Sequence, residues 1–198
     1  MEYKYDITQF NAILQNRRSV YPYQFEKGKI ITHDIIWQIL ENANRAPTHK
    51  LTEPWRFTVF TGEGLQHFSK LQSGIYTKHA GEKFKEKKLK NLLEYPLMSS
   101  HVIAIGMKRT TAFKIPETEE IIATACAIEN IYLTIAAYGL GGYLSTGGIT
   151  YLEEAKPYFN LEPEDQLIGF FYIGYPASLA NPLSKRQPVN EKVTWVDQ

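Results

Sequence analysis

The sequence predicts an α+β fold in which helices flank a mixed central β-sheet. Segments with helical spacing of apolar residues alternate along the chain with short apolar runs that are typical of strands. Three such runs, rich in aromatic and β-branched residues, lie at 55–61, 101–107 and 166–175. No linker, repeat or shift in composition divides the 198 residues, so we expect a single domain over 1–198.

The helices expected from the apolar spacing span residues 6–16, 32–45, 62–73, 117–138 and 152–159. Thr32 is placed to cap the second of them. The helix at 117–138 is apolar on most of its faces, and in a chain of this size such a helix suggests a subunit interface. Residues 74–96 are highly charged, and we interpret them as a candidate helical lid. Residues 139–148 are predicted to form a glycine-rich turn.

Charge and composition exclude several classes of protein. The 22 basic and 21 acidic residues give a formal net charge of +1, whereas nucleic-acid-binding domains are usually clearly basic. The single cysteine, Cys126, cannot form an internal disulfide, and the five histidines lack the paired spacing of a metal site. No apolar run approaches the roughly 18 residues that span a bilayer, and the first residues carry no signal-peptide core. We therefore expect a cytoplasmic protein.

Common nucleotide-binding and nucleophile motifs are absent from the sequence. Gly139 and Gly141 start a G-x-G-x-x-G pattern, but Leu144 interrupts it, and a helix rather than a strand precedes it. The chain has no G-x-x-x-x-G-K-[ST] motif, and Ser145 does not lie in a G-x-S-x-G elbow. The sequence offers no catalytic nucleophile, so the candidate functional segments are those that can hold a ligand.

Three separated segments are suited to holding a ligand. Residues 17–19, Arg-Arg-Ser at a helix end, supply two guanidinium groups and a hydroxyl that can bind a phosphate. Residues 44–57 comprise a helix end, a loop that offers Arg45 and His49 as donors, and the start of a strand. Residues 139–148 contain glycines that let the backbone approach a ligand closely.

In this order and at this spacing, the three segments resemble the nitroreductase family, and the resemblance covers nearly the whole chain. The match is closest to the short members of that family, in which R-R-S comes first, as at 17–19. Their A-P-x-H-K-x-x-x-P-W-x-F element matches residues 46–57, and their G-x-G-G element matches residues 139–142. Each motif is weak by itself, whereas the ordered set is specific.

The resemblance implies an intertwined homodimer with two FMN sites, each built from both subunits. The site residues that it implies are Arg17, Arg18 and Ser19 against the FMN, Arg45 and His49 reaching the flavin from the partner chain, Leu144, Ser145 and Thr146 along the isoalloxazine ring, and Lys185 and Arg186 at the phosphate. Backbone N–H groups of Thr146 and Gly147 are the expected donors near flavin N5. Many larger members carry Lys or Arg where this chain has Tyr21, and Arg45 is our candidate replacement for that cation.

The activity implied by the resemblance is two-electron transfer from NAD(P)H to a nitroaromatic, a quinone or a similar small acceptor by a ping-pong mechanism. The cofactor carries out the chemistry, so no catalytic side chain is required, and His49 is the candidate donor. Three alternatives stay open. They are an FMN enzyme of the same fold with other chemistry (dehalogenation, ring reduction or flavin cleavage), a non-enzymatic flavin-binding redox sensor, and a structural dimer with an empty site.

Overall fold

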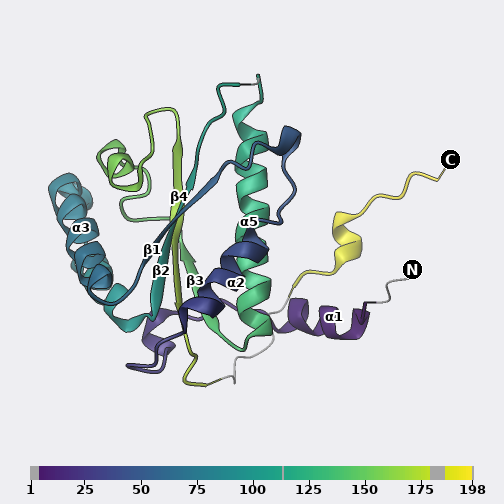
Figure 1. The fold of residues 1–198 in the computed structure, drawn as a ribbon, viewed down its shortest axis with the longest axis horizontal. Helices are drawn as coiled ribbons and strands as arrows, with labels where there is room; N and C mark the ends of the chain where they lie inside the picture. Colours follow the sequence, from purple (N-terminus) through teal and green to yellow (C-terminus); the bar gives the residue numbers. More distant parts are fainter. Residues whose placement is uncertain (1–4, 113, 179–185, 198) are drawn as a thin grey trace.

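The structure, a computed structural model, describes residues 5–112, 114–178 and 186–197 and has an α+β fold built around a four-stranded sheet (Figure 1). The strands are β1 (Trp55–Phe60), β2 (His101–Met107), β3 (Gly141–Ser145) and β4 (Gln166–Gly174), in the spatial order β1-β2-β4-β3. The three strands expected from apolar runs are confirmed. β3 lies in the segment predicted as a turn, because its two glycines weaken the strand pattern.

All three pairs of neighbouring strands are antiparallel, so the prediction of a mixed sheet is wrong for these four strands. For β1 and β2 the reason lies in the connection between them, which contains two α-helices, α3 and α4, rather than one. The second helix returns the chain to the end of the sheet at which β1 stops, and β2 then runs back beside β1. Parallel pairing is limited, among the described residues, to the isolated bridge between Ser19 and Gly142.

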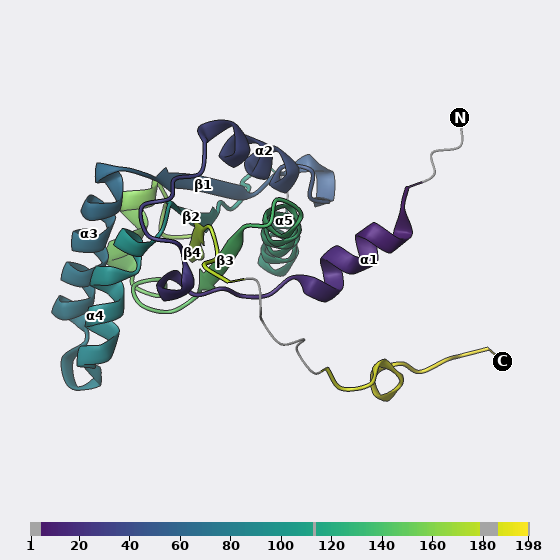
Figure 2. The ribbon, with the colours of Figure 1, turned by 90° about the horizontal axis from the view of Figure 1, so that it is seen from below.

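Helices cover both faces of the sheet. The α-helices are α1 (Ile7–Asn16), α2 (His33–Ala43), α3 (Glu63–His79), α4 (Glu86–Glu94) and α5 (Glu117–Ala137). Short 3₁₀ helices lie at Pro22–Gln24, His49–Leu51, Gly81–Lys83, Pro96–Met98, Glu153–Phe159 and Val189–Lys192. Figure 2 shows α3 and α4 on one face and α2 and α5 on the other. Thr32 occupies the N-cap position of α2, although its side chain makes no capping hydrogen bond.

The core divides into two apolar clusters, one on each face of the sheet. Because successive residues of a strand face opposite sides, β4 contributes to both clusters. Phe170 faces α3, where it packs near Phe68, whereas Phe171 faces α2 and α5. Phe171 packs there with Ile131 of α5 and Ile39 of α2, and all three are fully buried. Both helical layers are therefore fixed to the sheet by one central strand.

The segment 74–96, expected as a candidate lid, forms the last turns of α3, a 3₁₀ turn and α4. α4 packs along α3, and its Leu92 joins the core cluster on that face. The side chain of Gln72 donates to the Leu92 carbonyl oxygen at 2.6 Å, and the Ser69 hydroxyl donates to that of Leu93 at 2.7 Å. A role of this segment as a lid stays a prediction.

Among the described helices, α5 alone is long and apolar enough to cross a membrane by length and composition. The expectation from the sequence covered only uninterrupted apolar runs, and the acidic residues of α5 break such a run. α5 packs against α2 and the sheet, and its Ala127, Ile131 and Ile135 are buried in the core. This is the pattern of a core helix.

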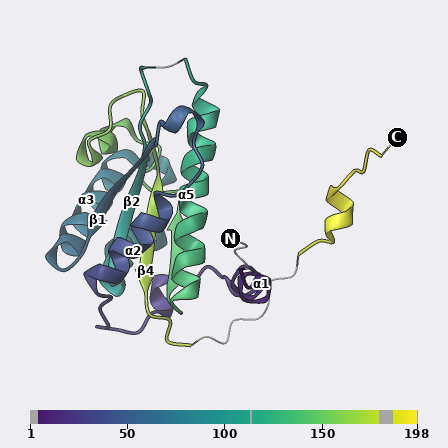
Figure 3. The ribbon, with the colours of Figure 1, turned by 45° about the vertical axis from the view of Figure 1, so that its right-hand side comes forward.

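The tail 186–197 lies away from the body of the molecule in all three views, and α1 projects from the body beside α5 (Figures 1–3). α1 begins at a regular cap, since the Asp6 side chain accepts hydrogen bonds from the N–H groups of Thr8 and Gln9. No residue of α1 is buried, and its apolar side chains Phe10 and Leu14 are 48% and 42% exposed. An isolated helix of this length is marginal in water, so its apolar side requires a partner surface.

A histidine is buried where β2 begins. His101 is 1% exposed, and its Nδ1 lies 2.9 Å from the hydroxyl oxygen of Ser100, which accepts a hydrogen bond from the Ile31 N–H. The ring of His33 lies 6.0 Å from that of His101. Burial, together with the nearby His33, lowers the pKa of His101 to about 4.

This pKa makes the stability of the protein depend on pH. Between about pH 6.5 and pH 4 the unfolded chain protonates His101 and the folded chain does not. Lowering the pH over this range therefore lowers the free energy of unfolding by up to about 3 kcal/mol. Urea unfolding at pH 7 and pH 4.5 should show a smaller fall for His101→Gln than for the parent. His67→Gln, at an exposed position of α3, is the matched control. Parallel pH profiles for the parent and His101→Gln would contradict this account.

Candidate functional site

The first and third ligand-binding segments lie side by side. Ser19 forms a parallel bridge with Gly142, and the N–H of Val20 donates to the Gly142 carbonyl oxygen at 2.9 Å. A Cβ at position 142 would lie 2.5 Å from Cε1 of Phe171 and closer still to Cδ1 of Ile135. Glycine at 142 therefore lets α5 and β4 pack here, and glycine at 141 lets the arm approach, since a Cβ at 141 would lie 2.9 Å from Cβ of Val20.

The two arginines of the first segment differ in their contacts. Arg18 donates from Nη1 to the Arg17 carbonyl oxygen at 2.6 Å. Its Nε is the one buried side-chain nitrogen or oxygen of the described chain that has no hydrogen-bond partner. A desolvated guanidinium N–H without an acceptor is costly, and an anionic ligand would supply that acceptor. Arg17 and Arg18 line a cavity of about 690 Å³ between α1 and α5, and Ser19 is exposed beside them.

The end of β3 and the loop after it form the wall of a second cavity. Leu144, Ser145, Thr146 and Gly147 line this space of about 280 Å³, opposite Lys88 of α4. Thr146 and Gly147 are exposed, and within the described residues their N–H groups have no acceptor. A Cβ added at Gly147 would meet no atom within 4 Å. The loop therefore presents free donors to open space.

Three tyrosines, Tyr95, Tyr143 and Tyr172, line this second cavity, and Tyr143 also packs against Tyr21. The ring of Tyr21 lies 4.4 Å from that of Tyr143 and 5.6 Å from that of Tyr23, with which it stacks. Burial, and then the neighbouring Tyr21, raises the pKa of Tyr143. Tyr172 closes the cluster at 6.2 Å from Tyr143, and burial raises its pKa as well. Tyr21, where the resemblance leads one to expect a cation, therefore belongs to an aromatic cluster.

The second segment lies elsewhere in the chain. His49 Nδ1 lies 2.5 Å from Oε2 of Glu119, near the start of α5, and Arg45 is exposed after α2. Arg17 instead lies near Glu129, ten residues further along α5, which corresponds to about 15 Å of helix. One chain thus combines the first and third segments, and it keeps Arg45 and His49 apart from them.

The tail contains the two residues that are expected to bind the phosphate, Lys185 and Arg186. Lys185 lies outside the described residues. Arg186 is exposed at the start of the tail 186–197, away from the body of the molecule. Arg186 is not brought to the arm 17–20 in a single chain, and the role of both residues stays a prediction.

The loop of the second segment holds an unusual backbone conformation. Lys50, Leu51 and Glu53 have φ values of 51°, 52° and 43°, in the left-handed region that disfavours residues with a side chain. The side chain of Trp55 fixes the end of the loop, because its Nε1 donates to Oδ1 of Asn44 at 2.9 Å. Such strain persists only where the surroundings enforce it, and it is often associated with function.

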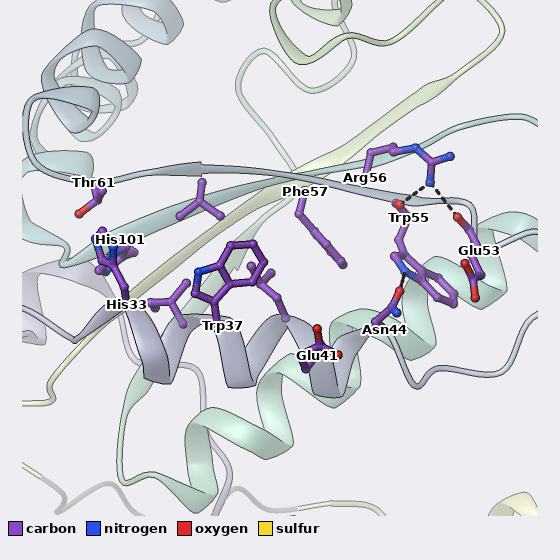
Figure 4. A pocket seen from close by; sticks show the side chains of 13 residues that line it. His33, Trp37, Glu41, Asn44, Glu53, Trp55, Arg56, Phe57, Thr61 and His101 are labelled. Carbon is purple, nitrogen blue, oxygen red and sulfur yellow. Dashed lines mark hydrogen bonds between the residues drawn. The ribbon is translucent and has the colours of Figure 1, made fainter.

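A third cavity, an apolar groove of about 540 Å³, separates α2 from the edge strand β1. Figure 4 shows Trp37 of α2 and Phe57 of β1 pointing into it, with His33 and His101 at one end. The groove holds none of the predicted ligand-binding side chains. Trp37, which is 65% exposed, is the sequence signal for it, since a tryptophan in an amphipathic helix need not face the core.

The sequence did not reveal the role of Tyr132 of α5, which contacts both the first and the third ligand-binding segment. The guanidinium carbon of Arg17 lies 4.9 Å from the centroid of its ring, and its hydroxyl oxygen accepts the Leu144 N–H at 3.0 Å. In the sequence, Tyr132 is one aromatic residue within a long apolar helix, so nothing distinguishes it from a core residue.

Comparisons with known proteins agree with this architecture. The family model described as the nitroreductase family matches residues 14–175. YdjA of Escherichia coli (strain K12), a candidate NAD(P)H nitroreductase by name, is 30% identical over 146 residues, which are 73% of this chain and 78% of YdjA.

Two solved structures have the same fold. A nitroreductase-like protein from Bacillus cereus superposes with a TM-score of 0.80 at 25% identity over 100% of both chains. NfnB from Sphingopyxis sp. strain HMH, an FMN- and NADPH-dependent nitroreductase, superposes with a TM-score of 0.73 at 14% identity over 95% of this chain and 99% of NfnB. With the family model covering most of the chain and the ordered motifs in place, this protein belongs to the nitroreductase family.

Proposed function

We propose that this protein is an FMN-dependent oxidoreductase that uses NAD(P)H to reduce nitroaromatics, quinones or similar small acceptors. The observation that carries the proposal is the buried Arg18 Nε without a partner, on an arm that pairs with β3, the strand whose following loop has free N–H donors. Family membership supports it, as do the cofactors in the names of its relatives, NAD(P)H for YdjA and both FMN and NADPH for NfnB.

The residues of the first segment fit the phosphate end of FMN. Arg17 and Arg18 supply charge, Ser19 supplies a hydroxyl, and the Arg18 Nε supplies a donor that already lacks an acceptor. A phosphate monoester carries about −1.5 to −2 charges near neutral pH and accepts several such bonds. In the proposed dimer, Lys185 and Arg186 complete this site from the tail.

The loop after β3 fits the ring system. FMN, when bound, supplies the hydride transfer itself. The chain contributes the surface of Leu144 and Ser145 against the ring and the N–H groups of Thr146 and Gly147 as donors. No atom lies within 4 Å of a Cβ added at Gly147, so a ligand can approach the backbone there. Because the donors belong to backbone at the end of a strand, they are fixed before the ligand binds, which favours a defined ring orientation.

We further propose that the active form is a homodimer, in which Arg45 and His49 of one subunit complete the site of the other. Two observations support a second copy. The second segment lies roughly 15 Å along α5 from the first within one chain. In addition, α1 carries an exposed apolar side with no buried residue. Arg45 would then supply the cation that Tyr21 does not.

The first expected outcome concerns the bound cofactor. Purified protein incubated with FMN should be yellow, and NADH or NADPH added without oxygen should bleach the flavin absorption, which a quinone or nitroaromatic restores. Flavin that binds but does not bleach would instead favour a redox sensor. A colourless protein after incubation with FMN would overturn the proposal.

The second expected outcome concerns the phosphate. Arg18→Ala combined with Ser19→Ala should weaken FMN binding by about a hundredfold, because two charged or polar contacts are lost. Arg18→Lys, which keeps the charge and loses Nε, should lie between the double variant and the parent. Titration of flavin fluorescence measures both. If the double variant keeps the affinity of the parent, the phosphate assignment is wrong.

The third expected outcome concerns the dimer. Phe10→Lys combined with Leu14→Lys places charge on the apolar side of α1 and should shift the protein from dimer to monomer in light scattering after size exclusion. Thr8→Lys combined with Gln15→Lys adds the same charge to the opposite side and should leave the dimer intact. A parent protein that elutes as a monomer would contradict the proposed assembly.

A further inference from the structure

We propose that Tyr132 is a positioning residue, whose phenol ties the loop proposed to line the flavin to the arm proposed to hold the phosphate. The proposal rests on the proposed function and adds to it a residue outside the three motifs. Tyr132 lies on α5, is half-buried, and lines the cavity that contains Arg17 and Arg18.

The hydroxyl of Tyr132 fixes the outer edge of β3. As the last strand of the sheet, β3 has no strand partner on one side. On that side the Val20 N–H binds the Gly142 carbonyl oxygen, and the Leu144 N–H donates to the Tyr132 hydroxyl oxygen at 3.0 Å. Alternate residues of a strand direct their backbone groups to the same side, so the Leu144 N–H is the last fixed outer donor before Thr146.

The ring of Tyr132 is itself held by the core. It contacts Phe171 edge to face, with centroids 4.5 Å apart and planes at 65°. Phe171 is fully buried and lies opposite Leu144 in the pairing of β3 with β4. The ring therefore contacts Phe171 of β4, and the hydroxyl contacts Leu144, its partner residue on β3. Core packing thus fixes the end of β3 from which the loop begins.

The same ring supports Arg17. The guanidinium carbon lies 4.9 Å from the ring centroid, within the range of a cation–π contact. Arg17 Nε also lies 4.0 Å from Glu129, three residues before Tyr132 on α5. One side chain thus contacts the proposed phosphate ligand through its face and the proposed flavin-lining segment through its hydroxyl. Phenylalanine at this position would keep the first contact and lose the second.

The test compares Tyr132→Phe with the parent in the full-length protein. We expect the Kd for FMN, measured by flavin fluorescence, to rise by about fivefold, the contribution of roughly one hydrogen bond. The visible spectrum of bound flavin should shift, and the Leu144 amide should exchange faster with solvent in FMN-free protein. Tyr138→Phe, at the C-cap of the same helix but exposed and in no contact with the loop among the described residues, should match the parent.

Further outcomes separate this proposal from the proposed function. An unchanged Kd and spectrum in Tyr132→Phe would overturn the positioning role even if the Leu144 amide exchanged faster, because the hydroxyl would then only satisfy a strand edge. Tyr132→Leu, which removes the ring as well, should weaken FMN binding more than Tyr132→Phe, and an affinity equal to the parent's would overturn the proposal. A parent that binds no FMN refutes the proposed function, and this is seen without any variant.

Discussion

The close packing at Gly142 is the constraint on which the candidate site depends. The arm 17–20 pairs with its backbone, while Ile135 of α5 and Phe171 of β4 lie where a Cβ would be, so a side chain here would displace both. Interiors at this density do not yield to an added methyl group without displacement of the backbone or of neighbouring side chains. The relative position of the two ligand-binding segments is therefore set by the core, and ligand binding does not have to create it.

This constraint explains how a chain without a nucleophile can have a defined site. Pre-organised donors stabilise a ligand because their alignment is already established by folding. Arg18 retains a buried N–H without a partner, and the loop after β3 retains exposed N–H groups, while nearby polar groups are satisfied. Unsatisfied groups in a folded protein destabilise it unless a ligand completes them. In the proposed complex, the cost of the unpaired Arg18 Nε would be recovered as affinity for the anionic ligand, whereas the exposed N–H groups of the loop would exchange water for it.

The sequence predicted some parts of this arrangement and not others, for physical reasons. β2 was predicted with its exact limits, because a continuous apolar run of β-branched residues has few other structures available. β3 was missed, because its glycines, which are required for packing, lower the strand propensity. The antiparallel pairing of β1 with β2 was missed because it depends on α4, whose charged sequence gives no clear pattern. Tyr132 could not be identified at all, since its importance lies in contacts with Arg17 and Leu144, which local spacing does not reveal.

The position of the second segment limits what one chain can do. Its loop is strained at three residues, and its His49 binds Glu119 near the start of α5, far from the arm 17–20. Backbone strain persists where other interactions offset its cost. Among the described residues of one chain, this loop contacts no proposed ligand site that could do so. A second copy provides that compensation if it places its own loop against the first subunit's cofactor. Binding of the cofactor would then stabilise the dimer and the dimer would stabilise the bound cofactor, because the two equilibria are linked.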